Sequence, residues 1–181
     1  CHARGVFELF PEARGIIDIG GQDSKVIRLN SGGNVEDFAM NDKCAAGTGR
    51  FLEVMASALE MDTEKMSSLA RKSKKDISIS SVCTVFAESE VVSLIGTGER
   101  IEDISAGLFK AIAKRVGAMY SRLGSPTPLV FTGGVARNAG VVEAMKMLFK
   151  TEILIPDVPD IMGAYGAALF ARESSSESDI R

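Results

Sequence analysis

The sequence predicts an α/β fold, because segments with the period of strands alternate with segments of helical period along the whole chain. Two apolar strand segments each run into a pair of glycines, at Gly20 and Gly21 and again at Gly133 and Gly134. The first of these strands is followed closely by a second, as in a β-hairpin. No internal repeat is visible in the sequence.

Three strands are predicted after a first segment that ends at Pro11. Residues 15–21 are apolar and run into a glycine turn, and residues 24–29 alternate like the second arm of a hairpin. Residues 36–40 are a third strand.

The middle of the chain is predicted to be mainly helical. From Thr48 to Leu59 apolar residues recur at helical spacing, and a shorter helix covers residues 66–70. The basic residues 71–75 mark an exposed connection. Residues 77–79 suggest a short strand leading to Cys83.

Two helices follow this cysteine. The first begins at about Thr84 and stops near Gly96 and Gly98. The second is long and amphipathic, with apolar residues at helical spacing through residues 104–123, and it is bounded by Gly124 and Pro126.

The last part of the chain again alternates strands and helices. Residues 129–132 form a strand that opens into the second glycine pair, and Asn138 is the predicted N-cap of a helix through Phe149. Residues 153–155 are a further strand, and residues 162–172 are a helix rich in Gly and Ala. The polar tail from Ser174 is expected to be disordered.

Composition excludes several classes of protein. The 181 residues are 45% hydrophobic and 25% charged, which is enough for one substantial core or two small ones. No apolar run approaches the roughly 20 residues that cross a bilayer, and no signal peptide is recognisable. The net charge of −3 and the pI of 5.3 argue against a nucleic-acid surface. Three cysteines, an odd number, fit a reducing compartment, so we expect a cytoplasmic protein.

The turn after the first strand is a candidate phosphate site. Glycines such as Gly20 and Gly21 let backbone N–H groups approach phosphate oxygens, and Asp18 could hold a magnesium-bound water or orient an attacking one. A hairpin turn with acidic flanks explains the same residues.

The second glycine pair is a candidate nucleoside or diphosphate site. A bare backbone at Gly133 and Gly134 can admit a flat group that a bulky side chain would block. The alternative is a tight turn between a strand and a helix. Both glycine pairs together with the small-residue helix around residues 163–168 indicate a nucleotide site more specifically than either pair alone. Small residues also allow close helix packing without a ligand, so the helix has this second explanation.

Cys44 and Cys83 are candidate metal-cluster ligands, because each precedes a predicted helix whose N–H groups and partial positive charge would stabilise a thiolate. They are too far apart for a C-x-x-C pair. Iron–sulfur clusters usually need four thiolates, which a two-fold dimer would supply from these two residues. The alternative is that both are ordinary core cysteines.

The other polar candidates are weaker. His2 is the only histidine, which argues against a Ser-His-Asp triad or a multi-histidine metal site, so we expect it to be structural. Glu88 and Glu90 could be paired catalytic carboxylates, but solvated or ion-paired surface groups are the better expectation.

Taken together, four segments resemble the BadF/BadG/BcrA/BcrD ATPase family. These segments are Ile-Asp-Ile-Gly-Gly-Gln-Asp (17–23), Asn-Asp-Lys-Cys-Ala-Ala-Gly-Thr-Gly-Arg-Phe (41–51), Cys-Thr-Val-Phe-Ala-Glu-Ser-Glu (83–90) and Thr-Gly-Gly-Val (132–135). The family includes ATP-dependent activators of 2-hydroxyacyl-CoA dehydratases and ATPase subunits of benzoyl-CoA reductase. The run around Cys44 is the most specific and favours the cluster explanation of the cysteines.

The resemblance implies an actin, hexokinase and Hsp70-like (ribonuclease H-like) fold that binds ATP or ADP with Mg²⁺ between two lobes. It also implies a homodimer with one 4Fe-4S cluster held by Cys44 and Cys83 of each subunit. Such proteins use ATP to drive a low-potential electron, taken from a reduced ferredoxin or flavodoxin, into a partner dehydratase or reductase.

By motif position, Asp18 and Gln22 would be catalytic, and Gly20 and Gly21 would contact phosphate. Gly133, Gly134 and Asn138 would bind on the nucleoside side. The family's earlier Gly-rich phosphate hairpin has no counterpart in this sequence. We therefore expect residues 1–173 to be largely the C-terminal lobe, followed by a tail at 174–181, and a further N-terminal portion to be missing.

Two other functions stay open. A noncatalytic domain of the same ancestry would dimerise or bind a partner without hydrolysing ATP. A relative of sugar or acetate kinases would transfer phosphate to a small acceptor, although no acceptor site is recognisable in the sequence.

Overall fold

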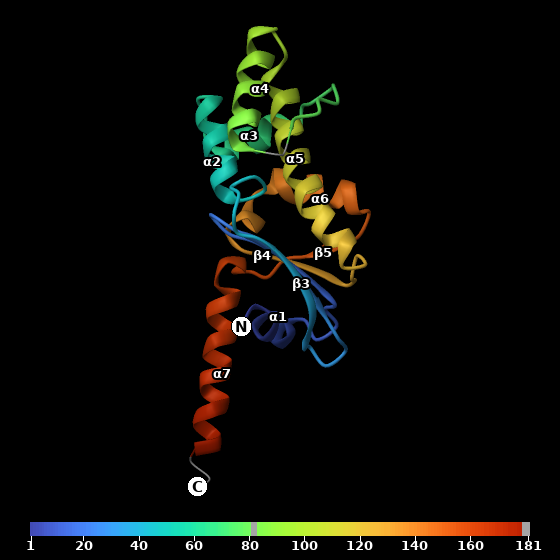
Figure 1. Cartoon of the computed structure of the whole chain (residues 1–181), viewed down its shortest axis with the longest axis vertical. Coiled ribbons are helices and arrows are strands. Elements are labelled where there is room, and N and C mark those ends of the chain that lie inside the picture. Colours follow the sequence, from blue (N-terminus) through green and yellow to red (C-terminus); the bar gives the residue numbers. More distant parts are fainter. Residues whose placement is uncertain (81–82, 179–181) are drawn as a thin grey trace.

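The computed structural model describes residues 1–80 and 83–178 (Figure 1). In chain order the elements are α1 (His2–Leu9), β1 (Gly15–Ile19), β2 (Ser24–Leu29), β3 (Val35–Asn41), α2 (Gly49–Ala58), α3 (Thr63–Ala70), α4 (Thr84–Gly96), α5 (Ile101–Arg122), β4 (Leu129–Thr132), the 3-10 helix η1 (Gly134–Arg137), α6 (Ala139–Phe149), β5 (Ile153–Leu154), the 3-10 helix η2 (Pro159–Ile161) and α7 (Met162–Ser178). The predicted α/β class is confirmed.

One mixed sheet organises the molecule, with strand order β3-β2-β1-β4-β5. Strands β1, β2 and β3 form an antiparallel meander, whereas β4 pairs parallel to β1 and β5 parallel to β4. Every residue of β1 and β4 is buried, as expected of central strands. Because β1 and β4 are parallel, the turns that follow them lie at the same edge of the sheet, where α/β proteins commonly bind ligands.

The helices cover both faces of the sheet. Helices α1 and α7 lie on one face, α5 and α6 lie on the other, and α2, α3 and α4 extend beyond α5 and α6 (Figure 1). Strand alternation divides the core accordingly: Ile16 packs with Val6 of α1, while its neighbour Ile17 packs with the larger cluster that includes Leu108 of α5.

Glycines bring α1 and α7 into close contact. A Cβ on Gly5 would lie 2.4 Å from the carbonyl oxygen of Met162, and a Cβ on Gly166 would lie 1.8 Å from that of Cys1. Both contacts are with backbone, which cannot move aside. Small residues in α7 therefore serve helix packing here, which was one of the two explanations left open for them.

The predicted strand at residues 77–79 is wrong. Ile77 and Ile79 are buried, but against α5: a Cβ on Gly107 would meet the carbonyl oxygen of Ile77 at 2.9 Å. The apolar alternation reflects packing on a helix, since residues 77–80 have no neighbouring strand in the described structure.

The C-terminal helix is longer than predicted. It continues through Ser178, where disorder was expected from Ser174, and residues 179–181 lie outside the described part. The hydroxyls of Ser174 and Ser175 donate to the carbonyls of Phe170 and Ala171 within the helix, each at 3.0 Å. Polar composition misled the prediction, because these serines satisfy their own helix.

No helix in residues 1–80 and 83–178 is long and apolar enough to cross a membrane.

Candidate functional site

Asp18 is the buried polar group at the carboxyl end of β1. Its side chain is only 7% exposed. Parallel pairing places Thr132 of β4 beside it, and the Thr132 hydroxyl donates to Asp18 Oδ1 at 2.8 Å. The other oxygen, Oδ2, lies 3.4 Å from Lys25 Nζ and 3.4 Å from His2 Nε2. Sheet register and helix α1 together fix this carboxylate.

These contacts also determine the charge of Asp18. Burial by itself raises the pKa of this carboxyl, but the hydrogen bond and charge of His2, the Thr132 hydroxyl and the charge of Lys25 lower it more. The pKa of Asp18 therefore lies below its usual range, and the side chain is an acceptor at neutral pH. A fixed, ionised carboxylate is suited to orienting a water molecule, whether free or bound to a magnesium ion.

The turn after β1 is fixed on the start of α2. The N–H groups of Gly49 and Arg50 donate to the carbonyls of Gly20 and Gly21 at 2.9 and 2.8 Å. No atom lies within 4 Å of a Cβ built on Gly21, so this backbone stays uncovered. Gln22 is also exposed. The turn is thus both a hairpin turn, as one explanation had it, and an open backbone surface.

The second glycine turn lies against the first strand. Gly133 has φ +85°, and a Cβ there would be 2.2 Å from the carbonyl oxygen of Ile19. Gly134 opens η1 and is exposed, with nothing within 4 Å of a built Cβ. The side chain of Val135 reaches within 3.4 Å of the Cβ position of Gly49. Both glycine pairs and the start of α2 therefore meet at one edge of the sheet.

Asn138 is the N-cap of α6, as predicted. Its Oδ1 accepts from the backbone N–H of Val141 at 3.1 Å and from the Ser67 hydroxyl at 2.9 Å. Ser67 is a buried residue of α3 that the sequence analysis did not single out, because nothing in a helical pattern reveals a contact with another helix. Asn138 thereby joins α6 to α3, next to the second glycine turn.

The two candidate ligand cysteines are reduced and half-buried, and they occupy different local structures. Cys83 is the N-cap of α4, as expected. Cys44 lies in the loop before α2 and not at the helix start, because Gly47 at φ +83° turns the chain and Thr48 is the N-cap. The buried amide of Asn41 holds this loop, donating to the carbonyl of Cys44 at 2.8 Å.

No group of three or more His, Cys, Asp or Glu is placed to hold a metal ion in the described residues. Cys44 and Cys83 offer two thiols, whereas iron–sulfur clusters are usually held by four. Next to Cys83, the apolar side chains of Val85 and Phe86 are both 64% exposed. Exposed apolar groups beside candidate ligands are typical of a surface that a partner covers.

The other two carboxylate candidates, Glu88 and Glu90, have different surroundings. Glu90 Oε2 accepts from the backbone N–H of Ser80 at 2.7 Å, while Glu88 is exposed on α4. Glu90 thus holds the segment before Cys83.

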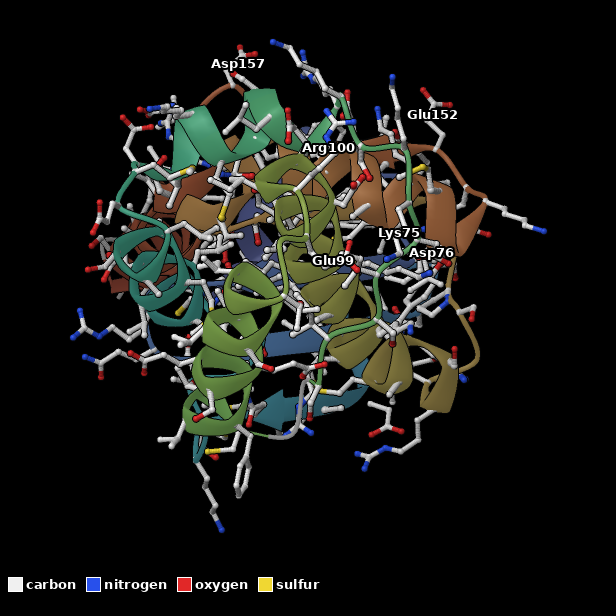
Figure 2. The ribbon with its side chains drawn as sticks, turned by 90° about the horizontal axis from the view of Figure 1, so that it is seen from above. Lys75, Asp76, Glu99, Arg100, Glu152 and Asp157 are labelled. Carbon is white, nitrogen blue, oxygen red and sulfur yellow. The ribbon has the colours of Figure 1, made fainter. Side chains whose placement is uncertain are left out.

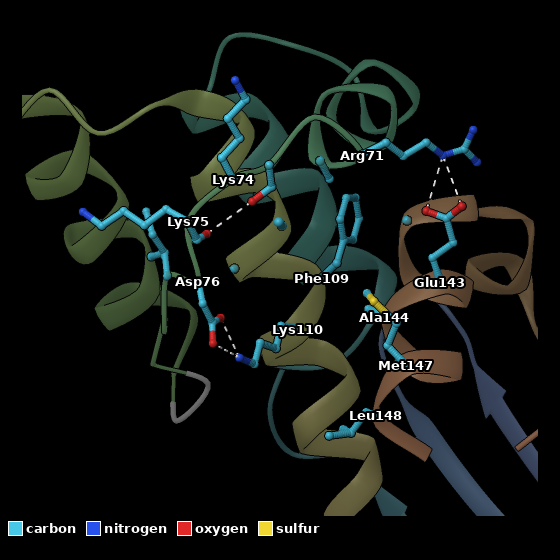
Figure 3. A pocket seen from close by; sticks show the side chains of 16 residues that line it. Arg71, Lys74, Lys75, Asp76, Phe109, Lys110, Glu143, Ala144, Met147 and Leu148 are labelled. Atoms are coloured by element: carbon cyan, nitrogen blue, oxygen red, sulfur yellow. Dashed lines mark hydrogen bonds and ion pairs between the residues drawn. The ribbon is translucent and has the colours of Figure 1, made fainter. Parts of the chain in front are cut away.

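A groove of about 660 Å³ lies between residues 70–77, α5 and α6 (Figure 3). Ion pairs flank it: Arg71 with Glu143 at 3.3 Å, and Lys110 with Asp76 at 2.6 Å. A further pair, Lys75 with Glu99, fastens the same connection to the turn before α5 (Figure 2). None of the predicted site residues is among those lining this groove, so we assign it no part in the site.

Sequence comparison identifies relatives along almost the whole chain. Residues 1–171 match the model described as the BadF/BadG/BcrA/BcrD ATPase family. The chain is 53% identical over 178 residues to the 2-hydroxyisocaproyl-CoA dehydratase activator of Clostridioides difficile, covering 98% of this chain and 67% of the relative. It is 49% identical over 177 residues to the activator of lactoyl-CoA dehydratase of Anaerotignum propionicum, covering 98% and 68%.

Structure comparison agrees. A solved structure of the activator of the 2-hydroxyisocaproyl-CoA dehydratase from Clostridium difficile, with bound ADPNP, superposes with a TM-score of 0.92 at 52% identity. The match covers 99% of this chain and 67% of that one. The predicted actin and hexokinase-like fold is thereby confirmed, and the chain spans about two thirds of the length of these relatives. This chain belongs to the BadF/BadG/BcrA/BcrD ATPase family.

Proposed function

We propose that this chain is an ATP-dependent activator that delivers a low-potential electron to a 2-hydroxyacyl-CoA dehydratase or a reductase of the benzoyl-CoA type. The observation that carries the proposal is its 53% identity, over 98% of its length, to a dehydratase activator. The electron would come from a reduced ferredoxin or flavodoxin. Residues 1–173 would form the ATPase region.

The nucleotide would bind where the two glycine turns meet. Gly20, Gly21 and Gln22 would lie on the phosphate side, with Asp18 positioning water near a magnesium ion. Gly133, Gly134 and Asn138 would lie on the nucleoside side. Two features support this assignment: the uncovered backbone at Gly21 and Gly134, and the buried, ionised carboxylate of Asp18. The related activator with bound ADPNP shows that such a fold can hold an adenine nucleotide.

Cys44 and Cys83 would hold one 4Fe-4S cluster per homodimer, two thiolates from each copy. The fit is supported by two reduced thiols, of which one caps α4, whose first N–H groups would stabilise negative charge. A bound cluster would supply the one-electron chemistry of the activator. The exposed Val85 and Phe86 beside Cys83 favour a second copy as the cover of this surface.

A continuous set of contacts joins the two candidate sites. The carbonyls of Gly20 and Gly21 accept from the first residues of α2, Cys44 lies in the loop just before α2, and α2 packs on α4, which begins after Cys83. Nucleotide binding or hydrolysis that moves the glycine turn would therefore move both thiol-bearing segments. Such movement would couple ATP turnover to docking of the dehydratase.

The test is anaerobic purification followed by iron, sulfide and ATPase measurement. We expect about four iron atoms per dimer, and ATP hydrolysis is measured on the same protein. Cys44→Ser or Cys83→Ser should each abolish stable iron binding, whereas Cys1→Ser should not, because Cys1 is exposed at the chain start. Unchanged iron in either of the first two variants would exclude the ligand assignment. Iron without ATP hydrolysis would favour a noncatalytic member of the same family.

A further inference from the structure

His2 is the first residue of α1, and its side chain is 32% exposed. Its ring reaches the buried carboxylate at the end of β1, with Nε2 3.4 Å from Asp18 Oδ2. Lys25 Nζ donates to the same oxygen at 3.4 Å and also pairs with Asp23 at 2.8 Å. The Thr132 hydroxyl occupies the opposite oxygen, Oδ1. His2 is thus the one described contact of Asp18 that comes from a helix and not from the sheet or its turn.

Helix α7 sets the position of the His2 ring. A Cβ on Gly163 would lie 2.9 Å from Cε1 and 3.1 Å from Nε2 of His2. A larger residue at position 163 would therefore displace the imidazole ring. The ring lies between Gly163 of α7 and Asp18. The same two helices are locked at Gly5 and Gly166 by their backbone contacts.

We propose that His2 is a positioning residue for Asp18, holding Oδ2 from the α1–α7 pair while Thr132 holds Oδ1 from the sheet. This inference rests on the proposed function, in which Asp18 orients water for ATP hydrolysis. A carboxylate held from both sides keeps one orientation, which is what a water-positioning group needs.

A purely structural His2 makes a different prediction. In that case its loss would lower stability and would affect ATP turnover only through unfolding. A positioning role instead lowers kcat in folded protein, and a replacement that restores an N–H donor near Nε2 should restore kcat. The side chain of Gln can place its amide nitrogen close to that position.

The first experiment measures steady-state ATP hydrolysis by the full chain. We expect His2→Ala to lower kcat about tenfold or more, with the KM for ATP changed less than about threefold, and His2→Gln to recover most of kcat. Gly163→Ala should also lower kcat, because the new methyl group displaces the ring. In the His2→Ala background, Gly163→Ala should have no further effect. Ala164→Ser, at an exposed neighbouring position of α7, is the matched control.

Equal effects of Gly163→Ala with and without the histidine would overturn the proposal, as would an unchanged kcat in His2→Ala. A second measurement does not depend on catalysis: thermal unfolding of His2→Ala, Asp18→Asn and the double variant. Coupled residues should give shifts in Tm that are not additive. If the unaltered protein does not hydrolyse ATP, the proposed function fails. Additive shifts in Tm would show that His2 does not hold Asp18 in position.

Discussion

At the scale of single residues, the two glycines after β4 have different physical roles. Gly133→Ala should destabilise the protein by about 3 kcal/mol, since φ is +85° and the new Cβ would clash with the backbone oxygen of Ile19. Gly134→Ala has open space and should change the free energy of unfolding by less than about 0.5 kcal/mol. Chemical denaturation of both variants measures the difference. Equal losses of stability in the two variants would contradict the argument that the backbone at position 133 requires glycine.

The lowered pKa of Asp18 predicts that the protein loses stability in acid. Its pKa is lower in the folded protein than the ordinary value of 3.8, so it stabilises the fold fully above that ordinary value. This contribution is lost as the pH falls from 3.8 through the lower, folded pKa. Asp18→Asn should therefore be less stable than the unaltered protein at neutral pH, with the gap closing below about pH 4. Thermal unfolding between about pH 2 and pH 7 checks this, and a gap independent of pH would contradict it.

The residues of the candidate site were partly predictable from the sequence. A strand followed by Gly-Gly placed Asp18, Gly20 and Gly21 at the end of β1. The partners of Asp18 were not predictable, because Thr132 reaches it through the parallel register of β4 and His2 through the packing of α1. Both depend on tertiary contacts that no local pattern encodes.

At the scale of elements, Asn138 connects two helices. Asn138→Ala should cost about 1 kcal/mol for the lost N-cap of α6, while the Ser67 hydroxyl keeps its other acceptor, the Thr63 carbonyl, at 3.0 Å. The measurement is urea denaturation. Ser67→Ala is the matched control, because it removes the hydrogen bond from Ser67 to Asn138 and leaves the cap. Equal losses in the two variants would show that the cap contributes nothing.

Helices were predicted better than short apolar segments. The amphipathic pattern identified α5 and α6 with their ends, because Gly124, Pro126 and Asn138 are local signals that act within one turn. The segment with Ile77 and Ile79 was misassigned, since two buried residues in alternation fit a strand or an extended chain on a helix equally well. The same limit applied to Cys44, which a turn at Gly47 separates from α2.

At the scale of the whole molecule, the alternation of elements predicted the class but not the order of the strands. The chain places β4 beside β1, with six helices or strands between them in sequence, and so assembles the glycine turns at one edge. The edge therefore depends on the pairing of β1 with β4, which are far apart in the sequence. The assignment of this edge to a nucleotide therefore needed the family motifs in addition to the periodicity.

The last prediction concerns assembly. If two copies meet at the surface around Cys83, Phe86→Ser should weaken the dimer by roughly thirtyfold, equivalent to about 2 kcal/mol, because a central aromatic residue contributes most to such an interface.

The free energy of unfolding of each copy should stay unchanged, since Phe86 is 64% exposed and is not part of the buried core. Met147→Ser is the matched control: that side chain is 73% exposed on α6, beside the groove and apart from the thiol-bearing segments. Sedimentation of the anaerobic protein measures both variants. A dimer that Met147→Ser weakens and Phe86→Ser leaves intact would place the contact between copies on the α6 face, and the cluster could then not be shared through α4.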